Sequence, residues 1–415
     1  DDGLYFAEGY TGPGFDTYLL LENPGKDPED SVLELFGNGG PISSNKVTVP
    51  ARSRLTLHLN LMAPAGDVSA RLTTREGSPL RAQRSMYFDY HGIRDGHTTG
   101  ASSASREWYF AEGYTGPGFD TYILVLNPQG VTAHLELELM TPEGSERNAL
   151  EIPAGARRTV RLNDLLPGAE LATKVTSDLP VVAERAVYFD MADRSGGSVA
   201  MGAQAAAEEW YFAEGYTGGE FDTWLLLANP SPSPVTAIAS FQRGDGVILE
   251  REVALRPRSR ATVHVDEIPG LENAEVSARV RADYPGVVAE RAMYFVYNGS
   301  LGTAGGGHAA MGANAPSSQW LIPEGYTGPG FECWVLVSNL EDKSVAVRLE
   351  LMGESGAEVV RELVLAPRAR ISVLENELLP GEGVSAEVTA PGGERLVVEG
   401  AFYFRYGDDI DGGSS

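Results

Sequence analysis

Hydrophobic and polar residues alternate in short runs along the whole chain. In residues 134–139, which read His-Leu-Glu-Leu-Glu-Leu, every second position is apolar. This period is typical of a β-strand with one buried and one solvated face. Similar runs, rich in β-branched and aromatic residues, are separated by Gly, Pro, Asn and Asp, which favour turns. No segment holds a helical period beyond a turn around 163–166, so the pattern predicts an all-β protein.

The sequence contains four copies of one unit. The string YFAEGYTGPGFDTY occurs at 5–18 and again, letter for letter, at 109–122, and variants of it occur at 211–224 and 321–334. Each copy ends in a second marker: SMYFDY at 85–90, AVYFDM at 186–191, AMYFVY at 292–297 and AFYFRY at 401–406. The repeat length of about 100 residues is that of an independent small domain and is too long for a solenoid repeat.

Each copy contains enough short apolar runs for a β-sandwich. In the second copy, seven candidate strands cover 108–114, 120–126, 134–140, 149–152, 158–162, 171–176 and 181–189. Seven strands in about 100 residues are typical of an immunoglobulin-like β-sandwich. We therefore expect four tandem immunoglobulin-like β-sandwich domains. Their expected bounds are 1–97, 98–207 with an initial linker, 208–298, and 299–415 with an initial linker and a short acidic tail. Small residues at 98–105, 196–207 and 299–318 indicate these linkers.

Charged residues in the apolar strands are candidates for buried pairs. Glu8, Glu112, Glu214 and Glu324 recur in the first marker, and Arg84, Arg185 and Arg291 recur in the closing strand. A buried charge is unfavourable unless it is paired. The hypothesis is that each Glu contacts the Arg of its own copy in the first three copies, whereas the fourth copy has Gly400 in place of the Arg. Two solvated charges at a sheet edge remain the alternative.

The EGYTGPGF segment allows a functional and a structural interpretation. Glu112 and Asp120 are candidates for holding a cation, and Tyr114 and Phe119 are candidates for stacking on a sugar. The structural alternative is a Gly-Pro-Gly turn whose aromatic residues pack inside the domain. Because all four copies carry closely similar residues, we favour the structural interpretation.

No residue pattern predicts catalysis, a cofactor or a metal site. The single cysteine, Cys333, is replaced by Thr at the equivalent positions, which indicates a small residue on a strand. His58 and His264 are equivalent, but other copies have Arg161 and Leu374 there, and no histidine spacing matches a zinc site. The tail at 408–412 is similar to the start of a calcium loop without its remaining ligands, so calcium binding stays open without a recognisable site.

Charge and hydropathy exclude two classes of partner. The chain has 32 Lys and Arg against 58 Asp and Glu, a formal net charge of −26. Such a surface repels nucleic-acid backbones and anionic lipids, so we expect no nucleic-acid binding. No stretch reaches the roughly 20 apolar residues of a membrane span, so we expect no membrane insertion. The first residues lack the basic and apolar regions of a signal peptide, so we expect either an intracellular or an already processed chain.

The repeated strings resemble a known family. WYFAEGYTGPGFDTY at 108–122, with a later VVAERAMYF at 287–295, resembles a repeat family of secreted and cell-surface bacterial proteins, a domain of unknown function. The resemblance covers all four copies, although the fourth departs from it at 321–323 and Gly400. It implies an extracellular tandem β-sandwich protein whose signal peptide has been removed, and it implies no enzymatic activity.

These observations lead to two expected functions. The first is a non-enzymatic structural protein of a bacterial cell surface, a rod-like stalk or a self-assembling filament subunit; the second is a carbohydrate-binding adhesin that recognises cell-surface glycans. For a filament we expect head-to-tail self-association, because the end repeats lack linker segments that cover internal strand edges. The residues expected at these contacts are Leu4, Tyr5, Phe6, Tyr10, Phe402, Phe404 and Tyr406.

Overall fold

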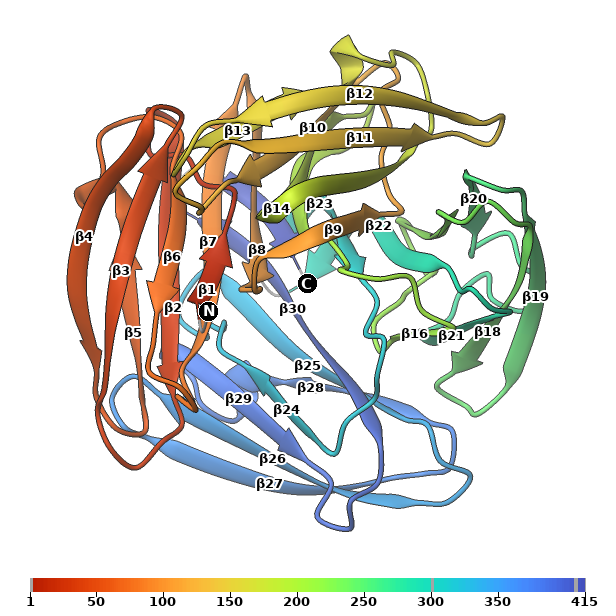
Figure 1. The fold of residues 1–415 in the computed structure, drawn as a ribbon. Coiled ribbons are helices and arrows are strands. Elements are labelled where there is room, and N and C mark those ends of the chain that lie inside the picture. Colours follow the sequence, from red (N-terminus) through yellow and green to blue (C-terminus); the bar gives the residue numbers. More distant parts are fainter. Residues whose placement is uncertain (1–2, 300–301, 407–409, 415) are drawn as a thin grey trace. The chain divides into compact units, whose positions relative to one another are not determined.

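The protein is all-β. The computed structural model describes residues 3–299, 302–406 and 410–414, and the strand pairs in this part of the chain are antiparallel (Figure 1). The chain divides into two compact units, Asp1–Ala205 and Ala206–Ser415. Each unit contains two of the four sequence copies, which are called repeats 1 to 4 below.

The first unit contains repeats 1 and 2. Repeat 1 forms β1 (Gly3–Phe6), β2 (Phe15–Asn23), β3 (Glu29–Gly37), β4 (Gly40–Val49), β5 (Ser53–His58), the 3-10 helix η1 (Leu59–Leu61), β6 (Ser69–Thr73), β7 (Arg81–Tyr90) and β8 (Ile93–Gly100). Repeat 2 forms β9 (Ser105–Phe110), β10 (Phe119–Leu126), β11 (Ala133–Met140), β12 (Ser145–Ile152), β13 (Arg157–Arg161), η2 (Leu162–Asp164), β14 (Ala172–Asp190) and β15 (Ser195–Met201).

The second unit contains repeats 3 and 4. Repeat 3 forms β16 (Glu209–Phe212), β17 (Phe221–Asn229), β18 (Val235–Arg243), β19 (Ile248–Leu255), β20 (Ser259–His264), β21 (Val276–Ala282), β22 (Val288–Gly299) and β23 (Gly302–Met311). Repeat 4 forms β24 (Gln319–Ile322), β25 (Phe331–Asn339), β26 (Val345–Gly353), β27 (Glu358–Leu365), β28 (Arg370–Leu374), η3 (Glu375–Glu377), β29 (Val384–Thr389), β30 (Leu396–Tyr406) and β31 (Ile410–Ser414).

Each repeat is a sandwich of two sheets. In repeat 1 the orders are β1-β6-β3-β4 and β5-β2-β7-β8, and repeats 3 and 4 have the same two orders. In repeat 2 the long strand β14 replaces the sixth and seventh strands and joins both sheets. Antibody constant domains instead group their strands ABED and CFG, so the likeness to the immunoglobulin class lies in the architecture and not in the strand order.

The segments expected to be linkers form strands instead. Residues 98–100 belong to β8, residues 196–201 to β15, and residues 302–311 to β23, which adds an eighth strand to the sandwich. The glycines that suggested a linker allow close packing: a Cβ on Gly197 would lie 2.6 Å from the Phe88 ring of the neighbouring repeat. Glycine in a strand often marks such a close approach.

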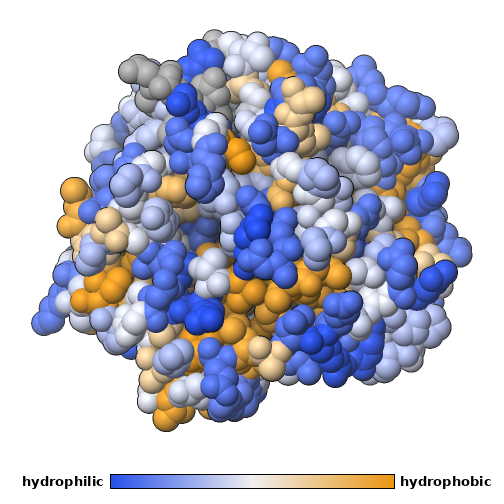
Figure 2. Space-filling model, turned by 90° about the horizontal axis from the view of Figure 1, so that it is seen from above, coloured by the Kyte–Doolittle hydropathy of each residue, from blue (hydrophilic) through white to orange (hydrophobic). Residues whose placement is uncertain are grey.

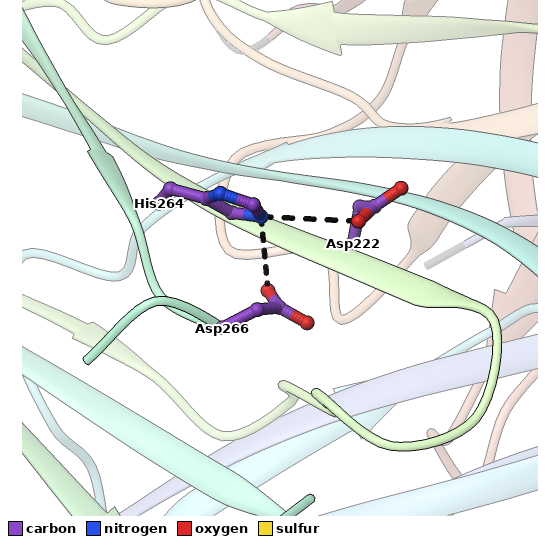
Figure 3. Close-up of side chains that lie close together, drawn as sticks. All are labelled: Asp222, His264 and Asp266. Carbon is purple, nitrogen blue, oxygen red and sulfur yellow. Dashed lines mark ion pairs between the residues drawn. The ribbon is translucent and has the colours of Figure 1, made fainter. Parts of the chain in front are cut away.

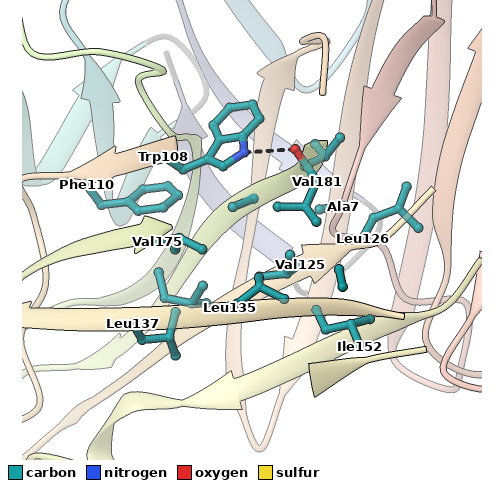
Figure 4. Close-up of a cluster of buried hydrophobic side chains, with 14 of the residues drawn as sticks. Ala7, Trp108, Phe110, Val125, Leu126, Leu135, Leu137, Ile152, Val175 and Val181 are labelled. Atoms are coloured by element: carbon teal, nitrogen blue, oxygen red, sulfur yellow. Dashed lines mark hydrogen bonds between the residues drawn. The ribbon is translucent and has the colours of Figure 1, made fainter. Parts of the chain in front are cut away.

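Within the first unit the two repeats share packed side chains. Figure 4 shows the core of repeat 2, in which the Trp108 indole donates a hydrogen bond of 2.9 Å to the Val181 carbonyl. Ala7 of repeat 1 belongs to this same cluster, as do Tyr5 and Phe36. The repeats of a unit are therefore packed against one another and do not form separate, independent domains.

One face of the molecule is mainly polar (Figure 2). Figure 2 shows one face, on which hydrophilic residues cover most of the area and hydrophobic residues gather in separate patches. Large exposed apolar side chains include Leu61, Tyr284 and Val364. Exposed apolar residues of this kind are common on soluble proteins and do not by themselves indicate a site. Within the described residues, no helix has the length and hydropathy to cross a membrane.

Candidate functional site

A buried charge network joins repeat 1 to repeat 2. The Arg84 guanidinium lies between two carboxylates: its Nη2 is 3.0 Å from Glu8 Oε2 and its Nη1 is 2.7 Å from Glu184 Oε2. All three side chains are at most 4% exposed. Glu8 thus contacts the Arg that the sequence paired with it, and Glu184 is a third member, from repeat 2, that the sequence reasoning missed.

Glu184 also binds the backbone of repeat 1. Its Oε1 accepts hydrogen bonds from the amides of Ala7, at 2.6 Å, and Glu8, at 3.2 Å. Burial raises the pKa of Glu8 to about 7, because the attraction of Arg84 does not offset desolvation and the nearby charge of Glu184. Two buried carboxylates therefore share one guanidinium, and Glu8 is the member that takes up a proton near neutral pH.

The second unit repeats this network with equivalent residues. Arg291 lies between Glu214 and Glu399, with an N–O distance of 2.5 Å to each. Glu399 comes from repeat 4, and its Oε1 accepts a hydrogen bond of 3.0 Å from the Ala213 amide of repeat 3. We call these two groups, Glu8–Arg84–Glu184 and Glu214–Arg291–Glu399, the junction triads.

Repeats 2 and 4 differ from each other at the position that Arg84 and Arg291 occupy in repeats 1 and 3. In repeat 2 the Nε of Arg185 lies 3.1 Å from Glu112 Oε2, and both side chains are buried. In repeat 4 the Arg is replaced by Gly400, where a Cβ would lie 3.1 Å from the Ile322 side chain. All three predicted Glu–Arg pairs are thus in contact in the structure, and solvated edge charges do not describe them.

The residues expected to mediate head-to-tail assembly lie mostly inside their own units. Tyr5, Phe6, Phe402 and Phe404 are buried, whereas Leu4, Tyr10 and Tyr406 are half-buried. The Tyr5 amide donates to the Ser102 carbonyl at 2.9 Å, so repeat 1 covers its own first strand. The premise that the edge of repeat 1 lacks its covering segment is therefore wrong.

The structure also distinguishes between the functional and the structural interpretation of the EGYTGPGF segment. Glu112 pairs with Arg185, whereas Asp120 binds Arg161, so these two carboxylates do not form one cation site. The Tyr114 and Phe119 rings pack edge to face with centroids 4.9 Å apart. The aromatic residues therefore pack as the structural interpretation expects.

A pocket of about 450 Å³ lies between repeats 1 and 2. Its aromatic wall contains Tyr90 stacked on Tyr188, with ring centroids 4.1 Å apart, and the hydroxyls of Tyr90 and Tyr122 are 2.7 Å apart. Burial raises the pKa of Tyr90 and Tyr188, so both phenols stay protonated. The other lining residues include Glu8, Tyr10, Phe15, Asp67, Asp89, His91, Leu124, Arg157 and Thr159.

Arg157 forms the polar base of this pocket. It donates from Nη1 to the Gly9 carbonyl at 2.8 Å and from Nη2 to the Thr159 hydroxyl at 3.0 Å. Its Nη1 also lies 3.5 Å from Asp67. Because the side chain is 1% exposed, burial lowers its pKa, although the guanidinium stays charged at neutral pH. The base thus combines a fixed cation with carboxylate and hydroxyl groups.

An equivalent pocket of about 370 Å³ lies between repeats 3 and 4. Its aromatic wall contains Tyr297 stacked on Tyr403, with centroids 3.8 Å apart. Its base contains Arg370, which donates to Glu275 at 2.9 Å and to Ser372 at 3.2 Å. Equivalent sequence positions line both pockets: Glu8 and Glu214, Tyr10 and Tyr216, Phe15 and Phe221, Asp67 and Glu275, Tyr90 and Tyr297, Tyr122 and Trp334, Arg157 and Arg370, Tyr188 and Tyr403. We call the two sites the junction pockets.

The electrostatic character of the junction pockets is acidic. The lining of the first pocket contains Glu8, Asp67, Asp89 and one arginine, and that of the second contains Glu214, Glu220, Glu275 and one arginine. An excess of carboxylates repels anions and does not oppose a neutral polar ligand. A volume of several hundred Å³, aromatic walls and a few polar groups are typical of a small-molecule site.

A different group of side chains in repeat 3 could hold a metal ion. Asp222, His264 and Asp266 each offer one ligand atom, and these three atoms lie within 4.8 Å of one another. The histidine spacing predicts no metal site here, because His264 has no histidine partner at zinc-site spacing. The missed signal is at position 266, where repeat 3 has Asp and the equivalent positions in the other repeats are Asn60, Asn163 and Asn376.

The fold and these sites define a β-sandwich protein built from paired repeats, with one junction pocket in each pair. Residues 2–187 match the model of the family of unknown function DUF5719. None of the curated proteins matches the sequence.

Several solved structures share local similarity with the chain. A crystal structure of Thermotoga maritima 1070 is 17% identical, covers 24% of this chain and 94% of its own, and has a TM-score of 0.23. The Anabaena sensory rhodopsin transducer is 26% identical over 20% of this chain and 95% of its own, with a TM-score of 0.18. Allantoicase from Saccharomyces cerevisiae is 10% identical over 78% of this chain and 77% of its own, with a TM-score of 0.17. At these TM-scores the similarities carry no conclusion about fold or function.

Proposed function

We propose that this chain is a non-catalytic, extracellular interaction protein of a bacterial surface, and that each of its two units binds a neutral sugar residue in its junction pocket. The observation that carries the proposal is the recurrence of one pocket in both units from equivalent positions. A requirement of folding alone does not call for an open, polar-based cavity at both junctions.

The pocket walls suit a sugar ring. Aromatic faces such as those of Tyr122 and Trp334 pack on the apolar C–H face of a sugar, and the more exposed carboxylates Asp67 and Glu275 hydrogen-bond to its hydroxyls. The acidic excess disfavours phosphorylated or uronic-acid ligands. A cationic amine is the competing ligand class, and the experiment below separates it from a neutral sugar.

Glu8, whose raised pKa would suit a general acid, is engaged in structural contacts, which supports a role other than catalysis. A carboxyl group with a pKa of about 7 could serve as a general acid. However, Glu8 Oε2 is held by Arg84, and Oε1 lies 3.5 Å from the Tyr188 hydroxyl. A general acid must reach the substrate proton, and both oxygens of Glu8 are already occupied.

Assembly into a filament through the terminal strand edges receives less support. Tyr5, Phe6, Phe402 and Phe404 are buried within their own units, so they offer little apolar area to a second copy. Surface anchoring and display of the two pockets remain part of the proposal, because the family resemblance implies an extracellular protein.

The test is a glycan array probed with the full chain, followed by calorimetric titration of any hit. We expect binding of neutral glycans with two sites per chain. Tyr122→Ala and Trp334→Ala should each remove one site, whereas Tyr18→Ala, at the equivalent strand position outside both junction pockets, should remove none. Binding of cationic amines but no neutral glycan, or equal loss with Tyr18→Ala, would contradict the proposal.

A further inference from the structure

Three potential metal ligands meet at one end of β17 and β20 in repeat 3. Figure 3 shows His264 facing Asp222 and Asp266: its Nε2 lies 3.8 Å from Asp222 Oδ1 and 3.6 Å from Asp266 Oδ2. The His264 ring stacks on Trp224 with centroids 3.9 Å apart, which fixes its orientation. The three groups are therefore held in place around one point.

His264 Nε2 is a buried atom without a hydrogen-bond partner among the described residues. The distances to the two carboxylates are too long for hydrogen bonds. They are close to the separation of roughly 3–3.5 Å between two ligands of one metal ion at bond lengths of about 2.0–2.2 Å. A shared cation would give the imidazole nitrogen a partner and bring the two carboxylates and the imidazole to one centre.

The other three repeats show what normally occupies the position of Asp266. The side-chain oxygen of Asn60 accepts from the Thr17 amide at 2.9 Å, and its amide nitrogen donates to the Phe15 carbonyl at 2.6 Å. Asn163 and Asn376 make the same pair of contacts. The Asn thus serves as acceptor and donor at once.

Asp266 can make only half of these contacts as a carboxylate. Its Oδ2 accepts from the Thr223 amide at 2.7 Å, as the Asn does, but an ionised carboxylate has no hydrogen to donate. The side chain is only 16% exposed, so its negative charge is unfavourable there without a counter-charge. A cation beside Oδ2, which lies 3.6 Å from His264 Nε2, supplies this counter-charge.

We propose that Asp222, His264 and Asp266 bind a divalent transition-metal ion, with Zn²⁺ as the best match. One imidazole nitrogen and two carboxylate oxygens are common ligands of zinc, whereas calcium requires six to eight oxygens. Asp222 is 41% exposed, so the ion can enter from solvent and water can complete its coordination. The ion would tie the turn after β20 to strand β17.

Repeat 1 contains a natural control for this site. Asp16 and His58 occupy the positions of Asp222 and His264, with His58 Nε2 3.2 Å from Asp16 Oδ1, and Asn60 takes the place of Asp266. The substitution Asp266→Asn therefore rebuilds in repeat 3 an arrangement that the fold already uses in three other repeats. It should remove the ion without disturbing the local backbone.

The test is calorimetric titration of the full chain with Zn²⁺, alongside the variants Asp266→Asn and His264→Gln. The wild type should bind one ion that both variants bind at least tenfold more weakly. Zn²⁺ should raise the melting temperature of the wild type and leave that of Asp266→Asn unchanged. Calcium should bind at least tenfold more weakly than zinc.

Three results would overturn this assignment. The first is a wild type that binds no zinc at submillimolar concentration, and the second is an Asp266→Asn variant with wild-type affinity. The third is tighter binding of calcium than of zinc, which would contradict the role of the imidazole. Because Asp266→Asn is expected to fold, its melting temperature without metal serves as the check that lost binding is not lost structure.

Discussion

The two units use the same buried contact and vary the pocket beside it. The junction triad is Glu–Arg–Glu in both, as Glu8–Arg84–Glu184 and Glu214–Arg291–Glu399. In the pockets, Tyr122 corresponds to Trp334, Asp67 to Glu275 and Thr159 to Ser372. Each exchange keeps the class of the side chain and changes its size. The comparison indicates that the triad is fixed by the requirements of burial, whereas the pockets tolerate adjustment.

The difference between the triads and the pockets follows from the stability that a substitution in each would cost. A buried guanidinium that loses one carboxylate leaves an uncompensated charge, which is strongly destabilising. A pocket side chain that faces a cavity can change volume with little effect on packing. The predictions below test this contrast, beginning with the largest expected effect.

Removal of the central arginine should destabilise either unit by about 3–5 kcal/mol, because two carboxylates, both buried in the first unit and one of them partly exposed in the second, lose their partner. Arg84→Met tests the first unit and Arg291→Met the second. Urea unfolding followed by tryptophan fluorescence reports the units separately in fragments 1–205 and 206–415, since Trp108 is the one tryptophan of the first fragment. A loss below about 1 kcal/mol in both fragments would show that the triads are not the main contact.

The first unit should lose stability as the pH rises through neutrality. The pKa of Glu8 is raised to about 7 in the folded state from an ordinary value of 4.5, so the folded state binds the proton more tightly. Its contribution is complete below pH 4.5 and is lost as the pH approaches and passes 7, for a total of about 3 kcal/mol. Glu8→Gln should flatten this part of the stability curve in fragment 1–205; an unchanged slope would refute the assignment to Glu8.

Glu184→Gln should have a smaller effect, about 1–2 kcal/mol. The amide oxygen of Gln can still accept from Ala7, and Arg84 keeps its contact with Glu8. The variant should also lower the pKa of Glu8, because a nearby negative charge is removed. Glu399→Gln is the matched change in the second unit, and clearly unequal losses in the two fragments would break the comparison between the units.

The smallest effect is expected for Tyr122→Trp, which gives the first pocket the residue of the second. We expect a change in the free energy of unfolding of about 1 kcal/mol or less, because the side chain faces a cavity. Denaturant unfolding of fragment 1–205 measures it. A loss as large as that of Arg84→Met would mean that the pocket walls are as constrained as the triad.

The sequence predicted the sandwich repeats and the Glu–Arg contacts because both depend on local signals. Strand alternation marks the sheets, and a recurring charge inside an apolar strand marks a paired charge. Glu184 carries the same local signal, because Glu recurs at its position as Glu290 and Glu399, but its partner lies in another repeat and no local pattern identifies that partner. Packing between repeats depends on tertiary contacts alone.

Two other features that the sequence pattern did not predict, the eighth strand and the role of Asp266, have physical explanations. The small residues of the eighth strand predict a linker because glycine disfavours strands, yet glycines such as Gly197 allow an aromatic ring of the neighbouring repeat to approach. The spacing of the histidines alone does not point to Asp266, because the other two ligands of the candidate site are carboxylates. Alignment of the four repeats shows the Asn-to-Asp exchange directly, and its meaning follows from the lost hydrogen-bond donor.

The central claim is that two repeats form one cooperative unit. The most direct test is native-state hydrogen exchange of fragment 1–205, with mass spectrometry of peptides from β2 and β7 in repeat 1 and from β10 and β14 in repeat 2. If the junction triad couples the repeats, both sets should exchange with the same free energy of opening, and Arg84→Met should lower both. Wild-type repeats that open with free energies differing by more than about 2 kcal/mol would contradict the claim.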